Sequence, residues 1–242
     1  MSLEKPPIAS YISTLMVAIF LFILVPVELA YCAEDETLSF LQAYVNYGEK
    51  VGGSDVLQWD GEGWVGKDYD KFWFKSKGVS PRDLVEEAEV QALYSRYLAE
   101  YWDLQIGARR DFEPSVRTYG VLGVQGLAPY FLETSVAAFV SEEGDLSGRA
   151  DVRYDILFTQ RAIAQLYFTG NVYAQNVNDR KVGAGLSDID TGLRIRFEFI
   201  HEFAPYLDFN YGRLFGRTAD FATSEGRDSN KSAIQAGLRF WF

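Results

Sequence analysis

Sulfur-containing residues are almost absent from this chain of 242 residues, which has one cysteine, Cys32, and two methionines, Met1 and Met16. A single cysteine excludes a disulfide framework, so stability has to come from the packed fold itself. The chain also lacks a basic stretch, because 34 Asp and Glu residues outnumber 23 Lys and Arg residues. This balance argues against a nucleic-acid partner, since nothing in the chain would neutralise a row of phosphates.

The N-terminal segment has the order of a secretory signal peptide. Lys5 precedes a long apolar run from Ile8 to Val27, and small residues follow at Ala30 and Ala33. A charged start, an apolar middle and a small-residue cleavage site are the three parts of such a signal. We expect cleavage near Ala33, giving a signal peptide over residues 1–33 and a short periplasmic N-terminus over residues 34–38.

Two other interpretations of this segment stay open. The apolar run is long enough to span a membrane as an uncleaved anchor. A lipoprotein signal would use Cys32, but Tyr31 is too bulky for the small residue expected just before a lipidated cysteine. Cleavage near Ala33 would remove the cysteine and both methionines, and would leave a mature chain without sulfur.

After this segment, apolar and polar residues alternate with a period of two. The pattern is clearest over residues 102–109, 149–158 and 188–199. It indicates β-strands that have one apolar and one polar face. A water-soluble sandwich and a membrane barrel both produce it, because the apolar face meets another sheet in the first and lipid in the second.

The end of the chain favours the membrane barrel. Alternate apolar residues run from Ile234 to Phe242, the last residue. A final strand with a terminal aromatic residue resembles the carboxy-terminal recognition signal of bacterial outer-membrane barrels. If Phe240 and Phe242 face lipid, Arg239 and Trp241 face the lumen, and this register fixes which residues point inward.

Connector lengths favour the same fold. Short connectors alternate with longer Gly-rich and charged ones, as the periplasmic turns and outer loops of such barrels do. We therefore predict an all-β protein, a closed antiparallel transmembrane β-barrel over residues 39–242, with ten or fourteen strands as alternatives to twelve. The twelve expected strands are 39–47, 56–66, 70–77, 85–96, 98–110, 118–127, 129–141, 147–159, 161–174, 185–199, 203–214 and 232–242.

Nine short motifs follow one another in the order of a known family. They are Trp59–Gly66, Lys71–Lys75, Gln91–Arg96, Trp102–Gly107, Gly123–Tyr130, Thr159–Arg161, Gly183–Ser187, Gly192–Glu198 and Glu202–Tyr206. Each motif is weak alone, but the series at this spacing is specific. From about Leu57 to Phe242 the chain resembles the copper resistance protein B family of outer-membrane proteins.

The resemblance implies a barrel in the outer membrane of a Gram-negative bacterium that works in copper tolerance by binding periplasmic copper or helping to export it. It implies a copper ion as the one candidate cofactor, not tightly bound. The expected partners are outer-membrane lipid and a periplasmic multicopper oxidase or copper carrier, with the barrel itself a monomer. Many members carry a Met- and His-rich segment before the barrel, but Glu34–Ser39 contains neither residue. Imidazole and thioether are the ligands that copper prefers.

The candidate metal ligands are therefore few. His201, the only histidine, stands beside Glu202 in a predicted turn and is either a copper(II) ligand or an exposed turn residue. The inward-facing rows add carboxylates that could attract cations, namely Glu87, Glu89, Asp103, Asp151 and Asp155. Arginines share these rows, so we favour the alternative that the charges form salt bridges that fill the lumen. Interface girdles are expected to explain most of the five tryptophans, Trp59, Trp64, Trp73, Trp102 and Trp241.

The sequence is compatible with three functions. The first is a copper-tolerance barrel, and the second is a porin for small anionic or neutral solutes, which lumen arginines would suit. The third is a structural or adhesion barrel that acts through its outer loops. An enzyme is not expected, because no nucleophile motif occurs and His201 has no adjacent Ser or Asp.

Overall fold

The computed structural model describes residues 37–50, 54–81, 86–200 and 202–242. The predicted signal peptide, most of the predicted stretch 34–38 and the candidate ligand His201 lie outside these residues.

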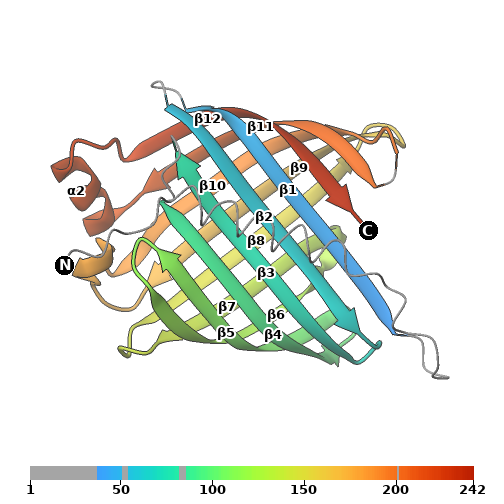
Figure 1. Cartoon of the computed structure of the whole chain (residues 1–242), viewed down its shortest axis with the longest axis horizontal. Helices are drawn as coiled ribbons and strands as arrows, with labels where there is room; N and C mark the ends of the chain where they lie inside the picture. Colours follow the sequence, from blue (N-terminus) through green and yellow to red (C-terminus); the bar gives the residue numbers. More distant parts are fainter. Residues whose placement is uncertain (1–36, 51–53, 82–85, 201) are drawn as a thin grey trace, which may run out of the picture. The chain divides into compact units, whose positions relative to one another are not determined.

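Twelve antiparallel strands form one closed barrel, in which each strand pairs with its neighbours in sequence and β1 pairs with β12 (Figure 1). The predicted fold and strand number are thereby confirmed. Closure gives every strand two partners, which a membrane requires because lipid offers no hydrogen bonds to a free edge. The strands are β1 Leu38–Lys50, β2 Ser54–Gly66, β3 Asp70–Pro81, β4 Glu87–Ala99, β5 Trp102–Glu113, β6 Arg117–Ala128, β7 Leu132–Ser141, β8 Leu146–Leu157, β9 Ala162–Tyr173, β10 Gly185–Phe197, β11 Phe203–Leu214 and β12 Asn230–Trp241.

Two predicted strand starts are wrong. The fifth strand was expected from residue 98 but begins at Trp102, because β4 continues to Ala99 and the chain turns at Tyr101, which has a positive φ of 65°. The seventh was expected from residue 129 but begins at Leu132. Pro129 has no N–H to donate to a ladder, and residues Pro129–Phe131 form a 3-10 turn, η2, instead.

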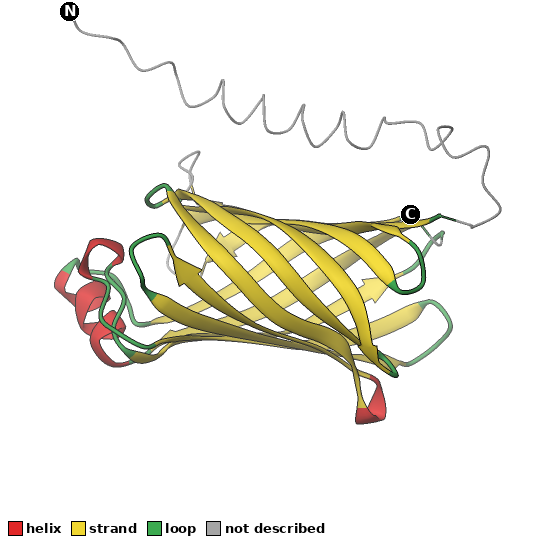
Figure 2. Ribbon diagram, turned by 90° about the horizontal axis from the view of Figure 1, so that it is seen from below, coloured by secondary structure: helices red, strands yellow, loops and turns green. Residues whose placement is uncertain are grey.

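The two ends of the barrel differ. One end, the short-turn end, carries connectors such as 67–69, 100–101 and 129–131. The opposite end, the loop end, carries the connectors 174–184 and 215–229. These two loops contain the 3-10 turn η3, Asn178–Arg180, and the helix α2, Gly216–Ser224, at the far end from η2 (Figure 2). Short turns lie on the periplasmic side in barrels of this kind. None of the helices among the described residues is long and apolar enough to cross a membrane.

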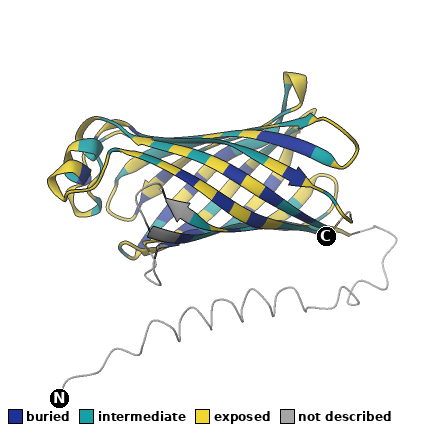
Figure 3. Cartoon of the chain, turned by 90° about the horizontal axis from the view of Figure 1, so that it is seen from above, coloured by how far each residue is buried: buried dark blue, intermediate teal, exposed yellow. Residues whose placement is uncertain are grey.

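Side chains alternate between the outer surface and the lumen along each strand (Figure 3). On β12, Gln235 is 1% exposed in the lumen, whereas its neighbour Ile234 is 57% exposed on the outside. Large apolar residues such as Ile106 and Leu166 cover the outer face in the same way. Such a surface suits contact with lipid, since soluble monomers rarely expose large continuous apolar patches. The register predicted from the last strand is confirmed at Arg239, which points inward and donates to Gln42.

The expectation that girdles explain most of the tryptophans is wrong, because Trp241 lies on the inward row of Arg239 and two more tryptophans face the lumen. Trp64 and Trp73 lie side by side on β2 and β3 with ring centroids 6.3 Å apart. Trp73 is buried inside the barrel with Leu93 and Phe139, and Trp64 packs against this cluster. Both occupy inward positions of their strands, so the period of two, not the residue type, decides their side.

Candidate functional site in the barrel lumen

One half of the lumen is filled by an arginine and a group of tyrosines. Arg194 on β10 lies 4.4 Å from the ring centroid of Tyr44 and 4.8 Å from that of Tyr206. Its guanidinium also pairs with Asp208, which is almost fully buried, at 3.1 Å. A guanidinium stacked on aromatic rings and paired with a carboxylate is the arrangement in which a buried arginine is stable.

Ion pairs cross the lumen at mid-height. Arg153 on β8 donates to Glu62 at 3.0 Å and to Asp60 at 3.4 Å, both on β2. Lys77 on β3 lies 3.6 Å from Asp151 on β8. β8 and β2 stand opposite each other in the ring of twelve strands, so these contacts bridge the interior.

A second set of charges crosses the lumen nearer the loop end. Arg149 donates to Glu89 at 2.7 Å, and Glu89 also pairs with Arg109 at 2.7 Å. Arg109 pairs with Asp111 at 2.6 Å, and Arg180 of η3 donates to the same carboxylate at 2.7 Å. We call Glu89, Arg109, Asp111, Arg149 and Arg180 the charge belt. It connects an outer loop to the opposite wall of the lumen.

Arg117 holds two connectors together at the loop end. Its side chain is 3% exposed and pairs with Glu143 and Asp145, both at 2.6 Å, and with Asp179 at 2.5 Å. Glu143 and Asp145 belong to the connector after β7, and Asp179 belongs to η3. We call Arg117 with its three carboxylates the loop clasp.

Exposed charges connect the loop 215–229, which contains α2 and is called the helix loop, to the loop 174–184, which contains η3 and is called the η3 loop. Glu225 accepts hydrogen bonds from Lys181 and from Arg227. These two cations hold the pKa of the Glu225 carboxyl below its ordinary value, chiefly through their hydrogen bonds. Lowering the pH through that pKa therefore removes this contact.

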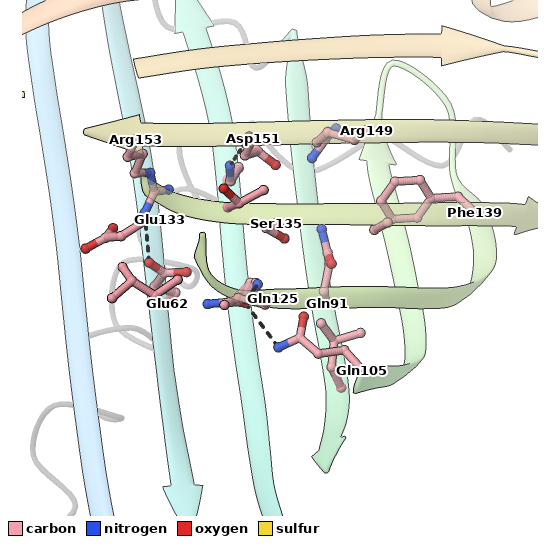
Figure 4. Close-up of a pocket in the computed structure, with 17 residues that line it drawn as sticks. Glu62, Gln91, Gln105, Gln125, Glu133, Ser135, Phe139, Arg149, Asp151 and Arg153 are labelled. Atoms are coloured by element: carbon pink, nitrogen blue, oxygen red, sulfur yellow. Dashed lines mark hydrogen bonds and ion pairs between the residues drawn. The ribbon is translucent and has the colours of Figure 1, made fainter. Parts of the chain in front are cut away.

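A cavity of about 240 Å³, lined by both polar and apolar groups, occupies the other half of the lumen (Figure 4). Strands β2 to β8 line it. Its wall combines charged side chains and the amides of Gln91, Gln105 and Gln125 with apolar surface, to which Leu93 and Phe139 contribute. Small-molecule sites combine an apolar surface with a few polar groups in this way.

The predicted carboxylate ligands on the strands mostly have cationic partners. Glu89 belongs to the charge belt. Asp103 accepts from Lys71 at 2.8 Å, and Asp151 accepts from Thr169 at 2.8 Å besides facing Lys77. Asp155 pairs with Arg196 at 2.5 Å. These contacts agree with the interpretation that the inward charges form salt bridges that fill the lumen.

The two remaining described candidates are exposed. Glu87 lies at the loop end of β4, and Glu202 lies at the short-turn end before β11, so the structure does not bring them together. Among the residues that the structure describes, no group of three or more His, Cys, Asp or Glu side chains is arranged to hold a metal ion. The metal-ligand assignments stay predictions.

Sequence reasoning missed several residues of the lumen. Lys71, Lys75 and Lys77 alternate with outward-facing Phe72 and Phe74, and this period of two could have placed them inside. Arg117 was expected in a connector, but it begins β6 and continues the inward row of Tyr119 and Val121. Arg180 carried no such signal, because its position depends on how the loop 174–184 folds back over the mouth.

A closed barrel of even strand number, with an apolar exterior and a charged interior, defines an outer-membrane β-barrel protein. The family follows from comparison with known sequences. The family model described as "Copper resistance protein B precursor (CopB)" matches residues 40–242, and the chain belongs to this family, as its motifs predicted.

Two curated relatives agree. The chain is 40% identical over 187 residues to Copper resistance protein B of Escherichia coli, covering 77% of this chain and 63% of the relative. It is 38% identical over 188 residues to the Copper resistance protein B homolog of Pseudomonas syringae pv. tomato (strain ATCC BAA-871 / DC3000), covering 77% and 64%. The matched region thus spans slightly less than two thirds of the length of these relatives.

Among solved structures, the NanC porin has a similar fold. The TM-score is 0.57 at 14% sequence identity, over 82% of this chain and 98% of the porin chain. At this identity the similarity concerns the fold alone.

Proposed function

We propose that this outer-membrane barrel serves in copper resistance, by binding periplasmic copper ions or helping to export them. The supporting observation is the family match over residues 40–242, together with relatives that are about 40% identical and named for copper resistance. The matched region makes up nearly the whole barrel, so the copper role is proposed for the barrel itself.

The chemistry of the barrel limits how copper would be held. The only cysteine and both methionines precede residue 33, and His201 is the only imidazole. Carboxylates are weaker partners for copper than imidazole or sulfur. Glu89, Asp103, Asp151 and Asp155 already face cations, so copper would have to displace a lysine or an arginine there. We therefore favour Glu202 with His201 for transient contact with periplasmic copper or with a copper-carrying partner, because Glu202 lies at the short-turn end and Glu87 at the loop end.

Deletion of the gene tests the role. We expect a deletion strain to grow less well in copper and normally in zinc, because the proposed role concerns copper alone. A plasmid with the wild-type gene should restore growth. The double substitution His201→Ala with Glu202→Gln should restore it only partly if this turn contacts copper. Unchanged copper tolerance of the deletion strain would contradict the proposal.

A small-solute porin is the alternative, favoured by the fold similarity to the NanC porin. The lumen arginines would suit anionic solutes. A wide pore is not expected, because ion pairs cross the lumen and occupy its interior. Conductance measurements separate the two functions.

A further inference from the structure

The charges around the lumen cavity are unevenly paired. Seven charged residues line the cavity, and five of them take part in ion pairs. These five are Glu62, Lys77, Arg149, Asp151 and Arg153. Lys75 and Glu133 have opposite signs and face the same cavity, yet neither forms an ion pair with the other or with another described residue.

Lys75 is held in place by neutral groups. Its Nζ donates to Gln125 Oε1 at 2.6 Å and lies 5.2 Å from the ring centroid of Trp73. Gln105 donates to the same Oε1 at 3.1 Å. These contacts fix the ammonium at the cavity wall, while the nearby carboxylate of Glu62 forms its ion pair with Arg153 and not with Lys75. An ammonium out of bulk water without a counter-ion is unfavourable, so an anionic group in the cavity would be stabilised there.

Glu133 supplies the opposite charge from another wall. It lies on β7, one residue after Leu132, where the strand leaves the short turn. Figure 4 shows its side chain at the cavity beside Arg153, whose guanidinium is already shared by Glu62 and Asp60. A cationic group in the cavity would therefore find an unpaired carboxylate at this position.

We propose that the lumen cavity binds a small zwitterion of the amino-acid type, with its carboxylate at Lys75 and its ammonium at Glu133. A volume of 240 Å³ equals roughly eight water molecules at about 30 Å³ each, which is enough for such a molecule. Side-chain amides of Gln91 and Gln105 add hydrogen-bonding capacity, and Phe139 supplies an apolar surface. This binding does not depend on the copper role.

The cavity extends close to the short-turn end, and we infer that its ligand enters there. Leu127 and Glu133 line it close to the turn 129–131. On the other side, the charge belt crosses the lumen between the cavity and the loop end. The ligand therefore comes from the periplasmic side of the membrane, where short turns lie in these barrels.

Isothermal titration of the full-length mature barrel in detergent micelles tests the proposal. The probes are glycine, L-alanine and L-glutamine, each with its N-acetyl derivative, which lacks the positive charge, and its α-amide, which lacks the carboxylate. We expect saturable binding of at least one parent amino acid and about tenfold or greater weakening for both of its derivatives.

Variants connect the binding to the two residues. Lys75→Met and Glu133→Gln should each weaken binding of the parent amino acid about tenfold or more. Lys231→Met and Asp190→Asn change inward positions outside the cavity and should leave it unchanged. Circular dichroism verifies the strand content of every variant. The proposal is overturned if no parent amino acid binds, if a derivative binds as well as its parent, or if both cavity variants bind like wild type.

Discussion

At the scale of single residues, the lumen shows how charges are kept inside a membrane barrel. Arg153 is mostly buried in the lumen and meets Glu62 and Asp60 from the opposite wall. Such pairs are only weakly stabilising against an apolar alternative, but removal of one partner leaves the other charge uncompensated. The carboxylates on β2 therefore depend on the arginine on β8.

We predict that Arg153→Met destabilises the barrel by about 3 kcal/mol, the lower end of the range for a broken buried pair, because some water reaches these groups. Urea unfolding of the barrel in lipid vesicles, followed by tryptophan fluorescence, measures the change. Arg110→Met is the matched control, since Arg110 is exposed and donates to the hydroxyl of the neutral Thr118. Equal stability of the two variants would show that the cross-lumen pair is unimportant.

At the scale of elements, the η3 loop is held over the mouth by side chains from other strands. Asp179 belongs to the loop clasp and Arg180 to the charge belt, and Gln175 donates to Asp145 at 2.9 Å. The loop thus has few backbone ladder bonds but several charged contacts. Local opening of such a segment depends on those contacts more than on the sheet.

We predict that Arg117→Gln makes the η3 loop more accessible to trypsin after Arg180 and Lys181. Loss of one charge-assisted contact corresponds to about a tenfold faster cleavage when opening is in equilibrium. Mass spectrometry of the fragments gives the rate at each site. Arg227→Gln removes an exposed ion pair of the helix loop and serves as control, with a change of less than about twofold expected. The clasp would have no role if both variants were cut like wild type.

At the scale of the whole molecule, the interior is divided rather than open. The tyrosine-stacked Arg194 fills one half, and the cross-lumen pairs and the charge belt obstruct the other. Barrels of about eight strands hold side chains or a small ligand, and barrels of roughly 16–18 strands leave an aqueous channel. In a barrel of twelve strands the lumen side chains therefore decide whether a channel remains. Free diffusion of solutes through it would need several of these contacts to break together.

We predict that the wild-type barrel shows little or no single-channel conductance in a planar bilayer. Glu89→Ala with Arg149→Ala should raise the conductance clearly, because both partners of a cross-lumen pair are removed and no charge is left unpaired. Lys181→Ala, on the exposed outer loop, serves as control. Wild-type conductance as large as that of the double variant would favour the porin function.

Much of this architecture was present in the sequence. The alternation of apolar and polar residues predicted twelve strands and the residues on their inward faces, because neighbouring residues of a strand point to opposite sides of a sheet. Ile234 and Gln235 illustrate this, since one is exposed to lipid and the other is buried in the lumen. The errors at Tyr101 and Pro129 concern turns, where local backbone geometry replaces periodicity.

Only the tertiary structure decided which inward residues meet. Closure of the ring brings β8 opposite β2, so Arg153 reaches Glu62, 91 positions away in the chain. The same closure leaves Lys75 and Glu133 facing one cavity, neither of them in an ion pair with a described residue. Periodicity determines the side of the sheet on which a residue lies. Its partner across the lumen depends on ring size, strand tilt and side-chain reach, which no local pattern encodes.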